Sequence, residues 1–188
     1  MKLAILERDG VICQAVEGLL TGHEAWQGWP EALAAVAQLN QAGWHVVLAA
    51  AQPGIGRGLY DCAALNDYHR QMYKELATAG AKVDAVFFCP HAPEDHCHCF
   101  APQSLLLRQI MERYNMDAGK VAVVAHSATL LQAAGQLGAC LHWVGDDDSA
   151  TPRPSTPLAC GSPFKHHTGL AACVEVLRQG QAAAQTAP

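Results

Sequence analysis

The segment Leu3–Ile12 constrains the fold of this chain more than any other, and it reads Leu-Ala-Ile-Leu-Glu-Arg-Asp-Gly-Val-Ile. Four apolar residues lead into two acidic residues, Glu7 and Asp9, and a glycine follows them. A short apolar run that ends at a turn is typical of a buried parallel strand. Ligands of open α/β sheets bind beside the carboxyl ends of such strands. Two carboxylates there suit a divalent cation and phosphate chemistry.

Apolar segments and helical segments alternate along the rest of the chain. Further segments short enough for central strands are His45–Ala50, Val83–Phe88, Val121–Val124 and Cys140–Val144. Apolar spacing and glycine stops predict helices between them, at about 30–42, 59–78, 102–114 and 128–137, with a last short helix at about 168–179. This alternation predicts right-handed crossovers and a parallel sheet covered on both faces, which is a Rossmann-like three-layer α/β fold.

The length of 188 residues fits one domain. We expect a single domain over 1–179 and a flexible tail over 180–188. The segment 145–168 is rich in Pro, Ser and Asp, and we expect it to be irregular; its run Asp146–Asp148 is interpreted as a solvated acidic loop.

Composition narrows the classes of function. The formal net charge of −5 and the scattered Lys and Arg residues argue against a nucleic-acid partner. No apolar run is long enough to cross a membrane, and the chain opens on a strand-like segment with no signal peptide in view. We therefore expect a cytoplasmic protein without a membrane partner.

The chain has eight cysteines. Five are dispersed, and we expect them to be buried apolar residues or unreactive thiols: Cys13, Cys62, Cys140, Cys160 and Cys173. The other three lie in one histidine-rich loop at 89–101, which favours a metal site over disulfides in a chain without a secretory signal.

That loop contains Cys-x-His, five further residues and then Cys-x-Cys. Three thiolates and one imidazole can complete a tetrahedral zinc site with no open position, which is the structural kind. His96 and His98 could compete as ligands. The alternative is a histidine-rich surface loop with unrelated thiols, and the position of the loop directly after a predicted strand favours zinc.

The first segment resembles the Asp-x-Asp-Gly motif of the haloacid dehalogenase-like (HAD) phosphatases. It is most similar to the branch of heptose bisphosphate phosphatases and histidinol phosphatases, which typically reads Leu-Asp-Arg-Asp-Gly-Val-Ile-Asn. The resemblance runs from Lys2 to about Ala139 and includes the Cys/His loop. It implies a HAD-like fold with no large cap domain and with a zinc loop that shapes the substrate entrance. The implied ligands are Cys89, His91, Cys97 and Cys99.

The catalytic positions of that family are altered in this chain. The resemblance implies that Asp9 is the acid/base, whereas Glu7 stands where the family has its aspartate nucleophile. Ala50 stands where a threonine donates its hydroxyl to phosphate, and Ala101 stands where a lysine neutralises phosphate. His126 replaces the first acid of the magnesium-binding motif, and Thr129 replaces the second. Candidate substrate contacts are Gln52, Arg57 and Phe100, the last in place of an arginine.

These changes lead us to expect a pseudophosphatase, which binds a phosphorylated-sugar-like ligand or a protein partner without hydrolysis. The alternative is a phosphatase of the heptose 1,7-bisphosphate or histidinol phosphate type with residual activity from Glu7 and Asp9. We expect structural zinc and regard magnesium as doubtful, since imidazole is a poor magnesium ligand. A further hypothesis joins Glu7, Asp9 and His126 in a zinc, manganese or iron site; the simpler alternative is a hydrogen bond from His126 to Glu7.

Overall fold

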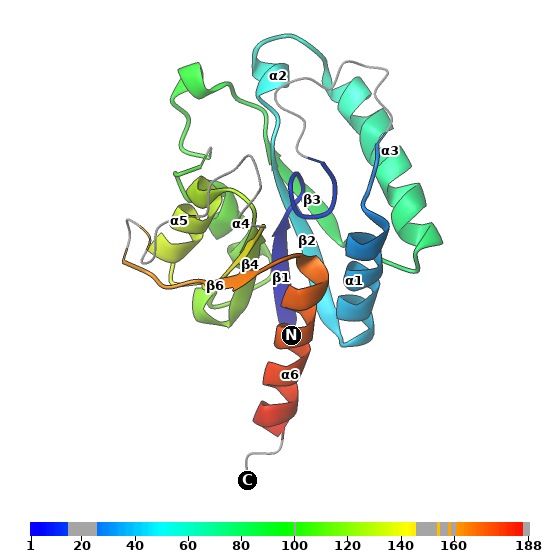
Figure 1. Ribbon diagram of the computed structural model, residues 1–188. Helices are drawn as coiled ribbons and strands as arrows, with labels where there is room; N and C mark the ends of the chain where they lie inside the picture. Colours follow the sequence, from blue (N-terminus) through cyan, green and yellow to red (C-terminus); the bar gives the residue numbers. More distant parts are fainter. Residues whose placement is uncertain (15–25, 100, 146–153, 155–157, 159–160, 186–188) are drawn as a thin grey trace.

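The computed structural model describes residues 1–14, 26–99, 101–145, 154, 158 and 161–185. Its centre is one parallel sheet of six strands in the order β3-β2-β1-β4-β5-β6 (Figure 1). The strands are β1 (Lys2–Glu7), β2 (Trp44–Ala51), β3 (Ala85–Cys89), β4 (Val121–Ala125), β5 (Cys140–Val144) and β6 (Lys165–His167). The predicted α/β fold with a parallel sheet is confirmed.

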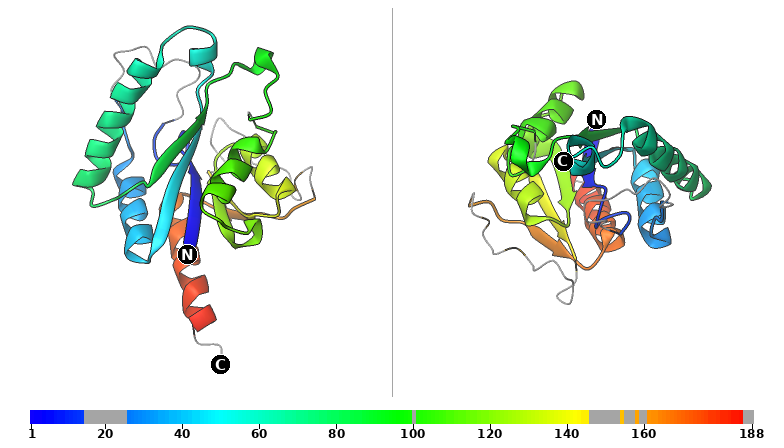
Figure 2. Two further views of the ribbon diagram at one scale, coloured as in Figure 1. Left: turned by 180° about the vertical axis from the view of Figure 1, so that it is seen from behind. Right: turned by 90° about the horizontal axis from the view of Figure 1, so that it is seen from above.

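Helices cover both faces of the sheet, as the views from behind and above show (Figure 2). They are α1 (Pro30–Gln41), α2 (Pro53–Gly56), α3 (Cys62–Thr78), α4 (Leu105–Arg113), α5 (Ala128–Gln136) and α6 (Leu170–Gln185), with short 3-10 turns η1 (Pro93–Asp95) and η2 (Ala118–Lys120). Side chains of a strand alternate between the two faces. Accordingly, Leu6 packs into the core that includes residues of α1, α3 and α6, whereas Ile5 packs into the core that includes residues of α4 and α5.

Strand β1 lies in the middle of the sheet, between β2 and β4. Its residues Leu3–Leu6 are fully buried, and burying each large apolar side chain contributes roughly 1.5–3 kcal/mol. The chain order reverses at β1, because β2 and β3 lie on one side of it while β4 and β5 lie on the other. The carboxyl end of β1 therefore faces the crevice where α/β sheets bind their ligands.

Three elements differ from the predictions. Strand β6 lies inside the segment expected to be irregular, because three polar residues at a sheet edge carry no apolar signal. The short helix α2 occupies part of the predicted loop after β2. Helix α6 continues to Gln185, beyond the predicted helix end at Gln179. The acidic run Asp146–Asp148 and Cys160 lie outside the described residues.

The dispersed cysteines that the structure describes differ in burial. Cys13 and Cys173 are buried as expected, whereas Cys62 and Cys140 are exposed. Among the helices that the structure describes, none combines the length and the apolar character needed to cross a membrane.

Candidate functional site

Glu7, the last residue of β1, turns its side chain toward the start of α5. Its Oε2 accepts hydrogen bonds from the backbone N–H groups of His126 and Ser127, both at 2.8 Å. Its Oε1 accepts one from the Ser127 hydroxyl at 2.6 Å. Burial raises the pKa of Glu7, and the bonds from Ser127 and His126 oppose that rise by favouring the ionised form. The positive end of α5 likewise favours the ionised form of this carboxyl group.

Asp9 lies in the turn after β1 and is held by the residue before it. Arg8 donates to Asp9 through Nε, at 3.0 Å to Oδ1, and through Nη2, at 2.8 Å to Oδ2. The Arg8 side chain is 3% exposed, whereas that of Asp9 is 23% exposed. Arg8 is thus buried, whereas a ligand can reach Asp9. The two hydrogen bonds from Arg8 fix the plane of the Asp9 carboxylate.

A buried histidine completes the support of Arg8. Arg8 Nη1 lies 3.1 Å from His69 Nε2, and because arginine can only donate, His69 accepts at Nε2 in its neutral form. The guanidinium also lies over the ring of Tyr68, 5.1 Å from its centroid. The sequence analysis did not identify Arg8, His69 or Tyr68, although an arginine between two acids was a usable signal.

His69 should make the protein sensitive to mild acid. Burial, together with the charge of Arg8, lowers the pKa of His69 to about 4, below about 6.5 in an unfolded chain. Between these values only the unfolded chain binds the proton. The contribution of neutral His69 to the free energy of unfolding is therefore fully present above about pH 6.5 and is lost as the pH falls toward 4. Allowing for solvent screening, we expect wild type to lose about 1–2 kcal/mol more than His69→Gln between pH 7 and 4.5. Urea unfolding at several pH values measures this, and parallel curves for the two proteins would contradict it.

His126 packs over the turn that carries Asp9. A Cβ on Gly10 would lie 2.7 Å from the His126 ring, and Gly10 has φ +79°, so only glycine fits this position. The His126 ring nitrogen Nδ1 bonds the Val144 carbonyl at 3.0 Å, and Trp143 Nε1 donates to the His126 carbonyl at 2.8 Å. The hydrogen bond from His126 to Glu7, named above as the simpler alternative, is present, and the backbone N–H of His126 donates it.

The proposed ligand set of Glu7, Asp9 and His126 does not form. Among the described residues, only two groups of three or more His, Cys, Asp or Glu side chains bring their ligand atoms within 4.8 Å of one another, and neither includes these three. Asp9 is held by Arg8 and Glu7 by the start of α5, so the two carboxylates have different partners.

A cavity of about 240 Å³ lies beside Glu7, between the ends of the strands and the Cys/His loop. Ala50 and Ala101 line it, together with Ser127 and Thr129 at the start of α5. No Lys or Arg is among the described residues that line it. The cavity can admit a small ligand, but its described walls offer a phosphate no cationic side chain.

The three candidate substrate contacts fall in different environments. Gln52 is 2% exposed and accepts a hydrogen bond from the Tyr60 hydroxyl at 2.6 Å, which places it in the core. Arg57 lies on the surface and pairs with Glu94 of η1 at 2.7 Å. Phe100 lies outside the described residues.

The Cys/His loop brings four ligand atoms together. Cys89 Sγ lies 3.5 Å from Cys97 Sγ and 3.2 Å from Cys99 Sγ, and His91 Nδ1 lies 3.2 Å from Cys99 Sγ. The edges of a tetrahedral site with zinc–sulfur bonds of about 2.3 Å are about 3.7 Å long. The cluster can hold a zinc ion after a small expansion. His96 and His98 are not part of it.

The chain is similar to named phosphatases over most of its length. No family model matches the chain. It is 45% identical to D-glycero-beta-D-manno-heptose-1,7-bisphosphate 7-phosphatase of Bordetella bronchiseptica over 144 residues, which is 77% of this chain and 80% of the relative. Identity to the enzyme of the same name from Pseudomonas aeruginosa is 39% over 132 residues, 70% of this chain and 74% of that one.

A solved structure shows the same relationship. The fold matches that of D,D-heptose 1,7-bisphosphate phosphatase from B. bronchiseptica complexed with magnesium and phosphate, with a TM-score of 0.83 and 39% identity, over 96% of this chain and 99% of that one. The expectation of a pseudophosphatase is therefore wrong, since the relatives that match at this level are named as phosphatases. That expectation rested on single positions compared with the family motifs, whereas similarity across the chain favours the alternative, a phosphatase.

Proposed function

Because the chain belongs to the family of D-glycero-beta-D-manno-heptose-1,7-bisphosphate 7-phosphatases within the HAD-like phosphatases, we propose that it hydrolyses a phosphate monoester of a phosphorylated sugar. The observation that carries this proposal is the 45% identity to a named phosphatase over 77% of the chain. The geometry at the end of β1 supports it, because a reachable carboxylate lies beside a second carboxylate at the strand end where such sheets bind ligands.

Asp9 is the residue that we assign to proton transfer. Its carboxylate is partly exposed, and both its oxygens are oriented by Arg8. Each carboxylate oxygen can accept more than one hydrogen bond, so Asp9 can still take a proton from water or give one to the leaving oxygen. A positioned acid/base typically contributes about 10²–10⁴-fold in rate.

Glu7 supplies the carboxylate at the position of the family's nucleophile, and we propose that it makes the enzyme slow. The side chain is one methylene longer than aspartate, and three hydrogen bonds turn it toward α5. A misplacement near 1 Å can cost about a hundredfold in rate. The alanines at positions 50 and 101 add to the loss, because the described cavity walls offer phosphate no lysine or arginine.

Zinc and magnesium suit different residues of the chain. We propose that Cys89, His91, Cys97 and Cys99 hold a structural zinc, which their three thiolates and one imidazole fit. Magnesium, present in the similar solved structure, prefers octahedral oxygen ligands. Glu7 and Asp9 offer it two carboxylates, whose oxygens keep lone pairs beyond the bonds that they accept from Ser127 and Arg8. We therefore propose these two carboxylates as the protein's ligands for magnesium.

Release of inorganic phosphate from D-glycero-D-manno-heptose 1,7-bisphosphate tests the function, with histidinol phosphate as the competing substrate and with magnesium present or omitted. We expect turnover with kcat/KM well below the usual range of about 10⁴–10⁸ M⁻¹s⁻¹. Asp9→Asn should lower it by a further 10²–10⁴-fold. Asp67→Asn is the matched control, since Asp67 is exposed and pairs only with Arg70 on α3 among the ion pairs of the described residues. Wild-type release no faster than that of Asp9→Asn on every ester would exclude the proposed function.

A further inference from the structure

A second cluster of ligand-type side chains lies away from the Cys/His loop. It consists of His142 on β5, His167 on β6 and Cys173 near the start of α6, and we call it the β5–β6–α6 triad. Their ligand atoms all lie within 4.8 Å of one another. The three residues are 3%, 7% and 0% exposed. They are therefore almost completely removed from water, and the triad shares no residue with the site around Glu7 and Asp9.

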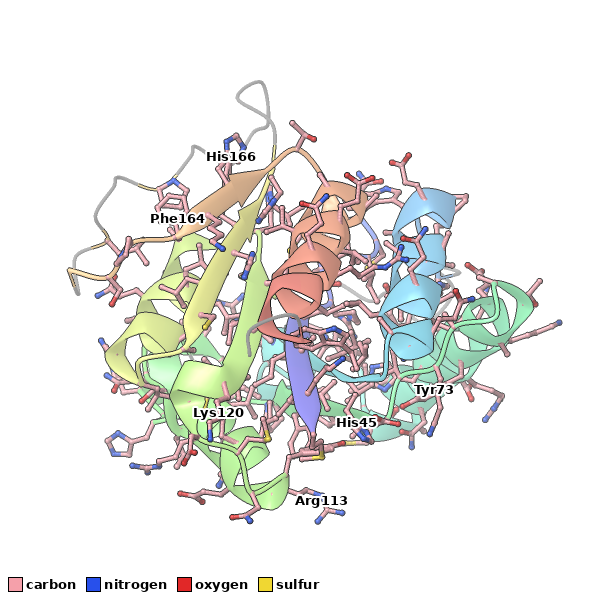
Figure 3. The ribbon with its side chains drawn as sticks, turned by 90° about the horizontal axis from the view of Figure 1, so that it is seen from below. His45, Tyr73, Arg113, Lys120, Phe164 and His166 are labelled. Atoms are coloured by element: carbon pink, nitrogen blue, oxygen red, sulfur yellow. The ribbon has the colours of Figure 1, made fainter. Side chains whose placement is uncertain are left out.

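The sheet register explains how these residues meet. His142 lies opposite Lys165, and Val144 lies opposite His167, so the two histidines belong to positions on the same face of neighbouring parallel strands. Helix α6 packs against β5 and β6 on that face, as seen from below in Figure 3, where His166 and Phe164 mark β6 and the segment before it. The helix thereby brings Cys173 to the two imidazoles.

The two imidazoles of the triad contact each other through one pair of ring nitrogens. His142 Nδ1 lies 2.9 Å from His167 Nε2, and the rings stack with centroids 5.2 Å apart. One of these nitrogens must present a lone pair, because a hydrogen bond needs an acceptor. Among the described residues, no acidic side chain forms a hydrogen bond with either ring. The ring pair therefore offers a lone pair beside the Cys173 thiol, which a metal ion can take up.

We propose that the β5–β6–α6 triad binds one copper(I) ion through two imidazoles and the Cys173 thiolate. Soft thiolate ligands select copper(I), zinc or iron–sulfur clusters, and imidazole suits copper and zinc. Zinc sites almost always take four ligands, whereas the described part of the chain provides three here. The ion enters as the thiol proton leaves to solvent, so no electron transfer is involved.

Charge favours the monovalent ion. Copper(I) and one thiolate form a site with no net charge, whereas zinc would leave one positive charge in a dry environment, which is expensive. Lys165 adds to this preference, because it lies opposite His142 in the sheet register and brings another positive charge to this strand pair.

The spacing requires only a small adjustment. Metal–nitrogen bonds of about 2.0 Å at 120° place two nitrogens about 3.4 Å apart, so the present 2.9 Å must open by about half an ångström. The sulfur atoms of the Cys/His loop need a similar expansion, since Cys89 and Cys99 are 3.2 Å apart. Both clusters are therefore slightly tighter than an ion-filled site.

Copper(I) titration of the zinc-loaded full chain tests the proposal, under anaerobic conditions and against a chromophoric copper(I) chelator. We expect one copper per chain while the zinc content stays unchanged, and X-ray absorption at the copper edge should show two nitrogen ligands and one sulfur. Cys173→Ser and His167→Gln should each weaken copper binding by about a hundredfold or more, since even the loss of a supporting residue costs 10–100-fold. Cys62→Ser, at an exposed cysteine, is the matched control and should bind copper like wild type.

Three results would overturn the proposal. The first is copper binding only as zinc is displaced, with an all-sulfur copper environment. The second is unchanged affinity in a folded Cys173→Ser variant. The third is a second equivalent of zinc that fills the triad and excludes copper. The absorption measurement on wild type decides the ligands even if both triad variants fail to fold.

Discussion

Introducing together the four side chains expected from the family motifs, with Glu7→Asp, Ala50→Thr, Ala101→Lys and His126→Asp, should raise kcat/KM for the sugar bisphosphate by about three orders of magnitude. The change supplies the shorter nucleophile, a hydroxyl and a cation in the cavity, and an acid for magnesium. One preorganised donor is typically worth about 10²–10³-fold in rate. Phosphate release measured with and without magnesium should also become strongly dependent on the metal.

The separate substitutions should do little. Glu7→Asp alone shortens the side chain that accepts three bonds at the start of α5, so we expect lower stability with no gain in rate. Groups that act as a unit give non-additive effects. The matched control keeps the other three substitutions and Ala101, and it places the lysine at the end of α3 as Ala79→Lys. If the changes in kcat/KM of the single variants multiply to give that of the combined variant, the four positions do not work as one site. A control variant as active as the combined variant would lead to the same conclusion.

Loss of the zinc ligand in Cys97→Ser should lower the melting temperature by roughly 5–15 °C and leave the fold intact. The loop packs closely on α2, because a Cβ on Gly56 would lie 2.6 Å from the Ala92 nitrogen, and Glu94 pairs with Arg57. The predicted shift corresponds to about 2–4 kcal/mol for a chain of this size. Differential scanning calorimetry and metal analysis measure the effect.

The control for this experiment is His98→Ser, which changes an exposed residue that is not part of the four-ligand cluster. Its zinc content and melting temperature should match those of wild type. Both described hydrophobic cores lack residues 93–99, so far-UV circular dichroism of Cys97→Ser should remain native. Two results would refute the structural role of the ion: wild-type protein that contains no zinc, or a melting temperature that His98→Ser lowers as much as Cys97→Ser does.

The sequence alone predicted five of the six described strands, the parallel sheet and the four-ligand cluster. Apolar runs such as Val121–Val124 predict central strands because burial on both faces removes the alternation of polar residues. The loop cluster was readable because its four ligands lie within eleven consecutive residues, where spacing limits geometry. Strand β6 was missed, because its three polar residues have neither apolar character nor length.

Only the tertiary structure decided what the side chains do. Glu7 meets Ser127 across 120 positions of chain, and Arg8 meets His69 across 61, so no local pattern could join them. The triad of His142, His167 and Cys173 depends on strand register and on the placement of α6. Local sequence determines secondary structure through burial pattern and backbone preference, whereas contacts between distant residues exist only once the sheet and its helices are packed.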